Sequence, residues 1–335
     1  MGKTKIKPPT YLDKFNYLKI PITPLHRLNR ISEILDVDLW IKRDDLFPMF
    51  NGGNKARMYV FINKEIEKHD CDAVITAGST QSNFARVTAL SAAANGWRCK
   101  LLLHGTQADL VQPKGNLLLM VLSGAEIEIV EKDQIRSRVE NSMNQFFEAG
   151  YKPYELHGGE NITGSIAYYD AVKEIDDQFR KEDWYPEWLI HTSGTGTTQA
   201  GLIVGKLHFG LDANIIGISI ARRNPRGINI VKNKCEQLVD LFEFDIKINS
   251  TMIDFRDNWI GEGYGFGNLK IKEVINNLAS YEGIILDPTY TGKAFTGLID
   301  LINNKEISRG SRVLFWHTGG LLNLMASEYI WDETQ

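Results

Sequence analysis

The sequence contains little cysteine, and neither sign of charge dominates it. Its three cysteines include no CxxC pair, which argues against a disulfide framework and against a thiolate zinc site. The 38 lysine and arginine residues are scattered among 42 aspartate and glutamate residues, unlike the basic surface of a nucleic-acid-binding protein. We therefore expect a small-molecule partner and no nucleic acid.

Long apolar runs are also missing. No stretch approaches the roughly 18 consecutive apolar residues of a membrane span, so we expect no membrane partner. Residues 1–15 carry basic side chains without the apolar segment that follows them in a secretory signal. These two absences predict a cytoplasmic protein.

Common hydrolase motifs are absent too. The seven histidines form neither an HxH nor an HExxH pair, and the sequence has no GxSxG motif. Neither a zinc hydrolase nor a serine hydrolase is supported, and we expect no metal site.

The sequence does contain short β-rich runs that end near glycine and alternate with helical periodicity. This alternation is typical of α/β domains built on a mostly parallel sheet, and 335 residues give room for about two of them. Ligands of such sheets bind beyond the carboxyl ends of the strands, so residues there are the first candidates for a site. The expected strands cover residues 73–78, 100–105, 188–196, 214–221, 283–288 and 312–320.

The strongest local signal is a Gly/Thr-rich turn between an expected strand and the helix that follows it. Backbone N–H groups and hydroxyls of such a turn can point at one place, as a phosphate requires. A tight turn that uses glycine and threonine for conformation and capping explains the same residues equally well. A nucleotide-binding loop also stays open, although neither GxxxxGK[ST] nor GxGxxG is present. The residues concerned are Gly194, Thr195, Gly196, Thr197 and Thr198.

Lys55 follows two glycines at the start of an expected helix. Met58, Phe61, Ile62 and Ile66 have the spacing of one buried helix face, which places Lys55 in the first turn. A lysine in a site of low polarity has a depressed pKa and can form a Schiff base with a carbonyl cofactor. Most lysines on such helices are solvated, so this interpretation depends on the neighbours of Lys55.

Two further groups follow expected strands or lie in loops. Gln81, Ser82 and Asn83 lie at another expected helix start, where donors converge on an anion such as a carboxylate, although helix capping explains them as well. Tyr264 and Tyr290 lie in glycine-punctuated loops, where a phenol can transfer a proton. Most of the 12 tyrosines are expected to be structural.

Taken together, seven motifs between Ile22 and Gly320 resemble the fold-type II pyridoxal 5′-phosphate (PLP) enzymes, the tryptophan synthase β-like group. Within that group they resemble the D-cysteine desulfhydrase and 1-aminocyclopropane-1-carboxylate (ACC) deaminase family. The resemblance implies two open α/β domains with the cofactor between them: a large PLP-binding domain of residues 1–55 and 166–335, and a small domain of residues 56–165. The motifs are PITPLHRL, LWIKRDDL, GGNKAR, TQSN, SGTGTTQAGL, DPTYTGK and HTGG.

The resemblance also implies roles for the residues around the cofactor. Lys55 is the Schiff-base lysine, and the loop of residues 194–198 holds the phosphate. Asn83 bonds the 3′-oxygen of the pyridine ring. Thr291 takes the place of an acidic residue that deaminase members have after the tyrosine of DPxY, and Thr318 of HTGG matches the desulfhydrase branch.

Residues implied to lie near the substrate complete the predicted site. Gln81, Ser82 and Asn83 lie near the substrate carboxylate, together with Phe84, where family members commonly have a polar residue. Tyr264 and Tyr290 flank the substrate. Lys55 or a nearby tyrosine moves the α-proton, and either Tyr290 or Ser82 makes the stereochemically decisive transfer.

The resemblance favours a cytoplasmic, homodimeric PLP-dependent lyase or deaminase that acts on a small amino acid, of D configuration in the desulfhydrase branch. A hydroxyl cannot keep the pyridine nitrogen protonated as a carboxylate can, so we expect β-elimination to an α-keto acid and ammonia. PLP-dependent β-replacement and ACC ring opening are the alternatives. A protein that binds PLP without catalysis is another, because Met58 stands where the family usually has a second lysine near the phosphate.

Overall fold

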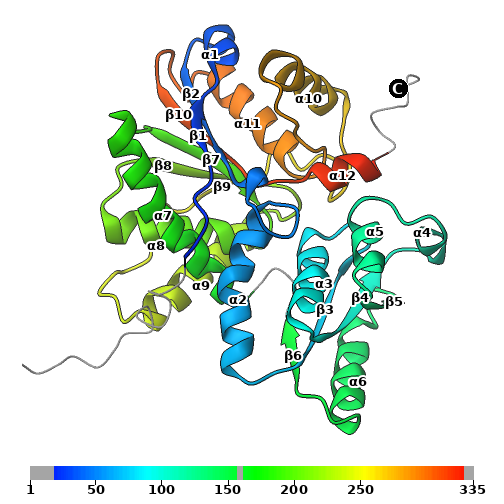
Figure 1. Ribbon diagram of the computed structural model, residues 1–335. Coiled ribbons are helices and arrows are strands. Elements are labelled where there is room, and N and C mark those ends of the chain that lie inside the picture. The colour runs from blue at the N-terminus through cyan, green and yellow to red at the C-terminus, as the bar shows by residue number, and fades with distance from the viewer. Residues whose placement is uncertain (1–18, 157–160, 328–335) are drawn as a thin grey trace, which may run out of the picture.

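The computed structural model describes residues 19–156 and 161–327 (Figure 1). Residues 1–15, on which the expectation about a secretory signal depends, lie outside this part of the chain. The elements in chain order are β1 (Leu25–Arg27), α1 (Asn29–Leu35), β2 (Asp38–Arg43), η2 (Asp44–Leu46), α2 (Asn54–Lys68), β3 (Ala73–Ser79), α3 (Asn83–Asn95), β4 (Arg98–His104), α4 (Gln107–Val111), α5 (Gly115–Leu122), β5 (Glu126–Ile129), α6 (Ile135–Glu148), β6 (Pro153–Leu156), α7 (Thr163–Glu182), β7 (Trp188–Ser193), α8 (Thr197–Phe209), β8 (Asn214–Ser219), α9 (Arg226–Leu241), η4 (Ser250–Met252), β9 (Asp254–Arg256), α10 (Leu269–Glu282), α11 (Thr291–Asn303), β10 (Arg312–His317) and α12 (Leu321–Ala326).

The strands form two sheets. The larger has the order β1-β2-β10-β7-β8-β9 and is parallel except for the pairing of β1 with β2; the smaller has the order β5-β4-β3-β6 and is parallel throughout. The chain leaves the large sheet after β2 through α2, builds the small sheet, and returns through α7, which packs against α2 (Figure 1). The predicted α/β fold with parallel sheets is confirmed.

Five of the six expected strands are present, and one prediction is wrong. Residues 283–288 form no strand, because this run passes between α10 and α11 without an extended neighbour to pair with. Ile284 and Leu286 are buried and supply the apolar character that suggested a strand. The carbonyl of Ile285 instead meets the His317 ring, and the N–H of Asp287 donates to Thr291 Oγ1 at 3.1 Å.

A buried cluster of charges, called here the ionic cluster, joins α2 to α7 and to the end of β2. Arg57 donates to Asp44 at 2.8 Å and to Glu174 at 2.6 Å, and Lys42 also pairs with Glu174. Burial alone would raise the pKa of the Asp44 carboxyl, but the Arg57 guanidinium lowers that pKa to about 2. Tyr168 and Trp316 add hydrogen bonds to Asp44 at 2.6 and 2.9 Å.

Neither a membrane span nor a metal centre is found in the part of the chain that the structure describes. Within residues 19–156 and 161–327, no helix combines the length and apolar character needed to cross a membrane. The same residues contain no group of three or more histidine, cysteine, aspartate or glutamate side chains placed to hold a metal ion.

Candidate active site

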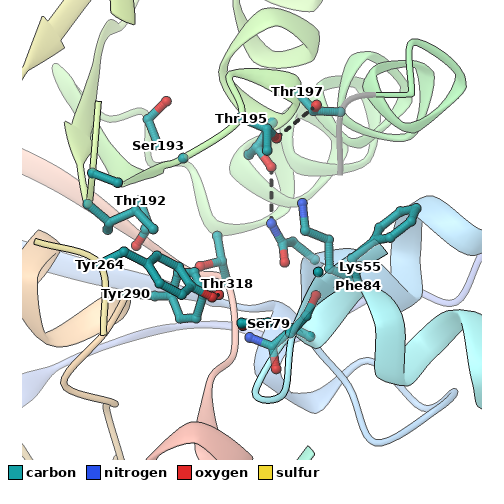
Figure 2. Close-up of a pocket in the computed structure, with 18 of the residues that line it drawn as sticks. Lys55, Ser79, Phe84, Thr192, Ser193, Thr195, Thr197, Tyr264, Tyr290 and Thr318 are labelled. Carbon is teal, nitrogen blue, oxygen red and sulfur yellow. Dashed lines mark hydrogen bonds between the residues drawn. The ribbon is translucent and has the colours of Figure 1, made fainter. Parts of the chain in front are cut away.

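A cavity of about 510 Å³ lies where strands of both sheets end, a size typical of small-molecule sites (Figure 2). The small sheet contributes residues 77–79 and 82–84 at the end of β3 and the start of α3. The large sheet contributes residues 192–198 at the end of β7 and in the turn that follows, 220–222 after β8 and 318–319 after β10. The cavity therefore lies at the carboxyl ends of parallel strands, as the sequence predicted.

The backbone before α2 positions Lys55 at the cavity. Gly52 and Gly53 have φ angles of 72° and 91°, and a Cβ on Gly52 would lie 2.1 Å from the Asp45 carbonyl oxygen, so glycine is required there. The N–H of Asn54 donates to the Thr318 carbonyl at 2.9 Å, which ties the start of α2 to the end of β10. Lys55 is consequently held in the first turn of α2, beside the large sheet.

The Lys55 amine is in an environment that favours its neutral form. Burial, followed by repulsion from Lys234 and Arg222, lowers the pKa of Lys55 to about 8. A neutral amine is a nucleophile and a base, whereas an ammonium group is neither. Lys55 therefore has both the position and the protonation equilibrium of a reactive lysine.

The Gly/Thr-rich turn after β7 faces the same cavity. All five of its residues, 194–198, are part of the cavity lining, and α8 begins within it at Thr197 after Gly196 turns the chain with φ 80°. The first turn of α8 carries no acidic side chain, so its N–H groups and partial positive charge are available to an anion. The Thr195 and Thr197 hydroxyls share a hydrogen bond of 3.1 Å, and Asn54 donates to Thr198 Oγ1 at 3.2 Å.

Tyr264 and Tyr290 lie together on another side of the cavity, away from Lys55 (Figure 2). Their hydroxyls share a hydrogen bond. Burial of the hydroxyls raises the pKa of both phenols, for Tyr290 well above its ordinary value. Both tyrosines therefore stay protonated at neutral pH and act as hydrogen-bond or proton donors.

Two buried groups hold the tyrosine pair in place. Asp287 accepts from the N–H of Tyr290 at 3.0 Å, and burial raises the pKa of this carboxyl to about 6. Lys293 of α11 donates to the carbonyls of Ile260 and Gly263 at 2.7 and 2.6 Å, directly before Tyr264. The loop that carries Tyr264 is thereby tied to the helix that follows Tyr290.

Several buried polar atoms of the lining have no hydrogen-bond partner among the described residues. They include Asn83 Oδ1, Thr192 Oγ1 and Ser193 Oγ. Leaving such atoms unpaired costs about 1–3 kcal/mol each, so native proteins rarely keep them without a purpose. A polar ligand in the cavity would supply the missing partners.

Most of the predicted site residues are brought together in this cavity, and two are not. Gln81 instead bonds the start of α5, accepting from the N–H of Asn116 at 3.0 Å and donating to the Lys114 carbonyl at 3.1 Å. Thr291 donates to Asp287 at 2.8 Å, beneath the tyrosine pair. The predicted residues in the lining are Lys55, Ser82, Asn83, Phe84, Gly194, Thr195, Gly196, Thr197, Thr198, Tyr264, Tyr290 and Thr318.

Several residues of the lining were not predicted from the sequence. Ser79, Thr192 and Ser193 are the last residues of β3 and β7, and Arg222 follows β8. The carboxyl-end rule would have found them, had it been applied to each strand's final residues as well as to the motif beyond it. Asn54, the first residue of α2, also lines the cavity, and its only signal in the sequence is its position directly before Lys55.

Comparison with known proteins identifies similar proteins over nearly the whole chain. Residues 17–319 match the family model described as "Pyridoxal-phosphate dependent enzyme". A D-cysteine desulfhydrase of Salmonella choleraesuis is 35% identical over 313 residues, which cover 91% of this chain and 93% of that protein. The crystal structure of an ACC deaminase homologue is similar with a TM-score of 0.85 at 29% identity, covering 95% of this chain and 97% of the other. Threonine deaminase isoform 2 of Solanum lycopersicum shares the fold, with a TM-score of 0.61 at 15% identity and coverage of 89% and 78%.

Proposed function

Because this chain belongs to the family of pyridoxal-phosphate dependent enzymes, we propose that it catalyses β-elimination from a small D-amino acid, with D-cysteine as the first candidate. The reaction consumes one water and converts D-cysteine to pyruvate, ammonia and hydrogen sulfide. The observation that carries the proposal is the placement of a half-buried lysine, Lys55, and a hydrogen-bonded tyrosine pair on different sides of one cavity.

The residues of the cavity fit PLP. Lys55 offers an amine for the cofactor's aldehyde, and the turn of residues 194–198 offers N–H groups and hydroxyls for its phosphate. The unpaired oxygens of Asn83, Thr192 and Ser193 support a polar ligand in this cavity. When bound, PLP supplies the electron sink that makes the α-proton of an amino acid removable.

We propose that Asn83 and Thr318 contact the pyridine ring, since both line the cavity that Lys55 and the two tyrosines also line. The division into a large domain, residues 1–55 and 166–335, and a small domain, residues 56–165, remains part of the proposal. It is supported by the two sheets, because every strand of the small sheet lies within residues 73–156. The cavity then lies between the domains and shields the reaction from water.

In the proposed reaction Lys55 removes the α-proton. A pKa of about 8 makes its amine a base near neutral pH. Tyr290, paired with Tyr264 and protonated, donates a proton to the departing thiolate. Ser82 lies at the start of α3 in the same lining, where its neighbours in the helix turn suit the substrate carboxylate.

The absence of a carboxylate from the described cavity lining favours elimination over ring opening. Thr318 lies in the lining, and no aspartate or glutamate of residues 19–156 and 161–327 does. A hydroxyl cannot hold a proton on the pyridine nitrogen, so the electron sink is weaker. A weak sink suits departure of a good leaving group better than opening of a cyclopropane.

The first experiment tests cofactor attachment and the reaction together. The purified protein is reduced with borohydride, and the pyridoxyl adduct is located by peptide mass spectrometry; we expect it on Lys55. D-Cysteine is then supplied, and pyruvate and sulfide are measured. An adduct on another lysine, or a loaded enzyme that forms no pyruvate from D-cysteine, contradicts the proposal.

Replacement of Tyr290 by phenylalanine tests its role as proton donor. Thiolate needs a proton as it departs, whereas chloride does not. We expect Tyr290→Phe to lower kcat with D-cysteine by about a hundredfold and to change kcat with β-chloro-D-alanine much less. Equal loss with both substrates would assign Tyr290 to a step before departure of the leaving group.

Two alternative reactions of the same site are distinguished by their products. The similarity to an ACC deaminase homologue favours ring opening as the second candidate, and release of a four-carbon keto acid from ACC would establish it. In β-replacement, a nucleophile enters where the leaving group departed. Pyruvate formation that does not depend on added thiols or amines counts against replacement as the main activity.

We also propose a homodimer in the cytoplasm. Helices α5 and α12 pack together and expose apolar side chains, which a second copy would cover; light scattering of the purified protein tests this. All three cysteines are free thiols, as is usual in a reducing compartment. The exposed apolar residues are Leu118, Val121, Leu122, Leu321 and Met325.

A further inference from the structure

Helix α2 meets the turn of residues 194–198 with an uncharged side chain. Met58 is one helical turn after Lys55 and buried, and the Lys55 amine lies 3.8 Å from its sulfur. A Cβ built on Gly164 would lie 3.2 Å from both Met58 Sδ and Thr197 Cγ2, so the thioether flanks the turn. Apart from Lys55 itself, α2 therefore brings no positive charge to this place.

A first cation reaches the turn from the loop after β8. Arg222 lines the cavity, and its Nη1 donates to the carbonyl of Gly194, the first residue of the turn. The carbonyl of Arg222 in turn accepts from Ser219 Oγ at 2.7 Å, which fixes the loop at the end of β8. The hydrogen bond to Gly194 holds the guanidinium against the turn, and the bond to Ser219 fixes the backbone of Arg222 at the end of β8.

A second cation comes from α9. Val231 of this helix packs on the turn, since a Cβ on Gly196 would lie 3.1 Å from Val231 Cγ2. Lys234 follows three residues later, on the same helix face, and is only 7% exposed. Lys234 and Arg222 both repel the charged form of the Lys55 amine. They lower the pKa of Lys55, although burial lowers it more.

We propose that Lys234 and Arg222 supply the positive charge that balances the cofactor's phosphate in this protein. The phosphate carries a charge near −2 at neutral pH, and the N–H groups of α8 offset only about half a charge. Cations placed on two sides of the turn satisfy the remainder. The inference rests on the cofactor of the family and is independent of which reaction the enzyme catalyses.

The test compares binding of PLP with binding of pyridoxal, which lacks the phosphate. The full chain is freed of cofactor, and dissociation constants for both compounds are measured by absorbance titration. The variants are Lys234→Met and Arg222→Met. The matched control is Lys232→Met, which removes a partly exposed lysine of the same helix that pairs with Glu236.

We expect each of the two variants to weaken PLP binding about tenfold or more, the loss of a charge-assisted contact, and to leave pyridoxal binding unchanged. The control should change neither. Adding Met58→Lys to Lys234→Met should recover most of the lost PLP affinity, because it returns a cation to the flank of the turn.

Two results overturn the inference. Equal weakening of PLP and pyridoxal assigns these residues to the shape of the cavity, and unchanged PLP binding in both variants removes them from the phosphate site. Neither result bears on the elimination reaction, which is read from product release by the unaltered protein. Circular dichroism of the cofactor-free variants identifies any that fails to fold, and for that position Lys234→Gln or Arg222→Gln replaces methionine.

Discussion

Lys55 and Arg57 lie two residues apart on α2, yet they face opposite kinds of environment. Arg57 enters the ionic cluster, where both of its carboxylate partners bond it within 3 Å. Lys55 faces a cavity whose lining contains buried oxygens without partners. Satisfied charges thus join α2 to α7 and to the end of β2, whereas the unpartnered polar atoms of the cavity are available to a ligand.

The protonation equilibria of the two regions differ in the same way. In the ionic cluster, the Asp44 carboxyl stays charged because Arg57 lowers its pKa to about 2. In the cavity, burial and nearby cations lower the pKa of Lys55 to about 8, which favours its neutral form. Asp44 therefore keeps its charge at any pH near neutrality, whereas Lys55 gains or loses a proton only about one pH unit above it.

The largest expected effect comes from removing the amine on the cavity side. Lys55→Ala should lower elimination activity by about a thousandfold or more, because both covalent attachment and α-proton removal depend on it. The free energy of unfolding of this variant should not fall, because the substitution removes a cation that burial and the nearby charges of Lys234 and Arg222 disfavour. If Lys55→Ala lost stability as well as activity, the claim that Lys55 serves the cavity and not the stability of the fold would be wrong. Urea denaturation and pyruvate release measure the two.

Removing the charge of Arg57 in the ionic cluster should mainly lower stability. Arg57→Met leaves Asp44 and Glu174 without their shared partner, and we expect the free energy of unfolding to fall by about 3–5 kcal/mol. Urea denaturation measures it. The control Lys64→Met removes an exposed pair with Glu67 on the same helix and should change stability by at most about 1 kcal/mol.

Lys293→Met tests whether a buried lysine can position the catalytic side of the cavity. Loss of its two bonds to the Ile260 and Gly263 carbonyls should lower kcat about tenfold and raise amide exchange in residues 260–268, with little change elsewhere. The exposed Lys270, paired with Asp300, provides the control. Faster exchange spread over the whole chain would make Lys293 a general stabiliser.

The smallest expected effect is a difference in pH dependence. In cofactor-free protein, labelling of Lys55 by an amine-selective reagent should rise about tenfold per pH unit and level off above pH 8, because only the neutral amine reacts. Lys152, whose pKa is raised by Asp70, should still become more reactive above that pH. Peptide mass spectrometry measures both lysines in one sample; identical profiles would show that the cavity does not perturb Lys55.

Much of the fold and of the candidate site was predictable from local sequence. The glycines at 52 and 53, the helical spacing of Met58 and Phe61, and the turn at 194–198 each specify a backbone shape that the structure has. The strand predicted over residues 283–288 was wrong, because an apolar run indicates burial but does not indicate whether a neighbouring strand is there to pair with it. Gln81 was expected at the cavity from its position at a helix start and from the resemblance, and Thr291 from the resemblance alone. Their side chains instead bond neighbouring elements of the fold.

The sequence by itself determined that the chain forms parallel α/β sheets, and it predicted that Lys55 and the turn of residues 194–198 face one site, because those features depend on residues close together along the chain. Only the tertiary structure decided that Arg57 is buried between Asp44 and Glu174, and that Arg222 and Lys234 approach the turn that Met58 leaves uncharged. The pair of Arg57 with Glu174 joins residues 117 positions apart in the chain. No local pattern records it, since it is set by which helices the sheets bring together.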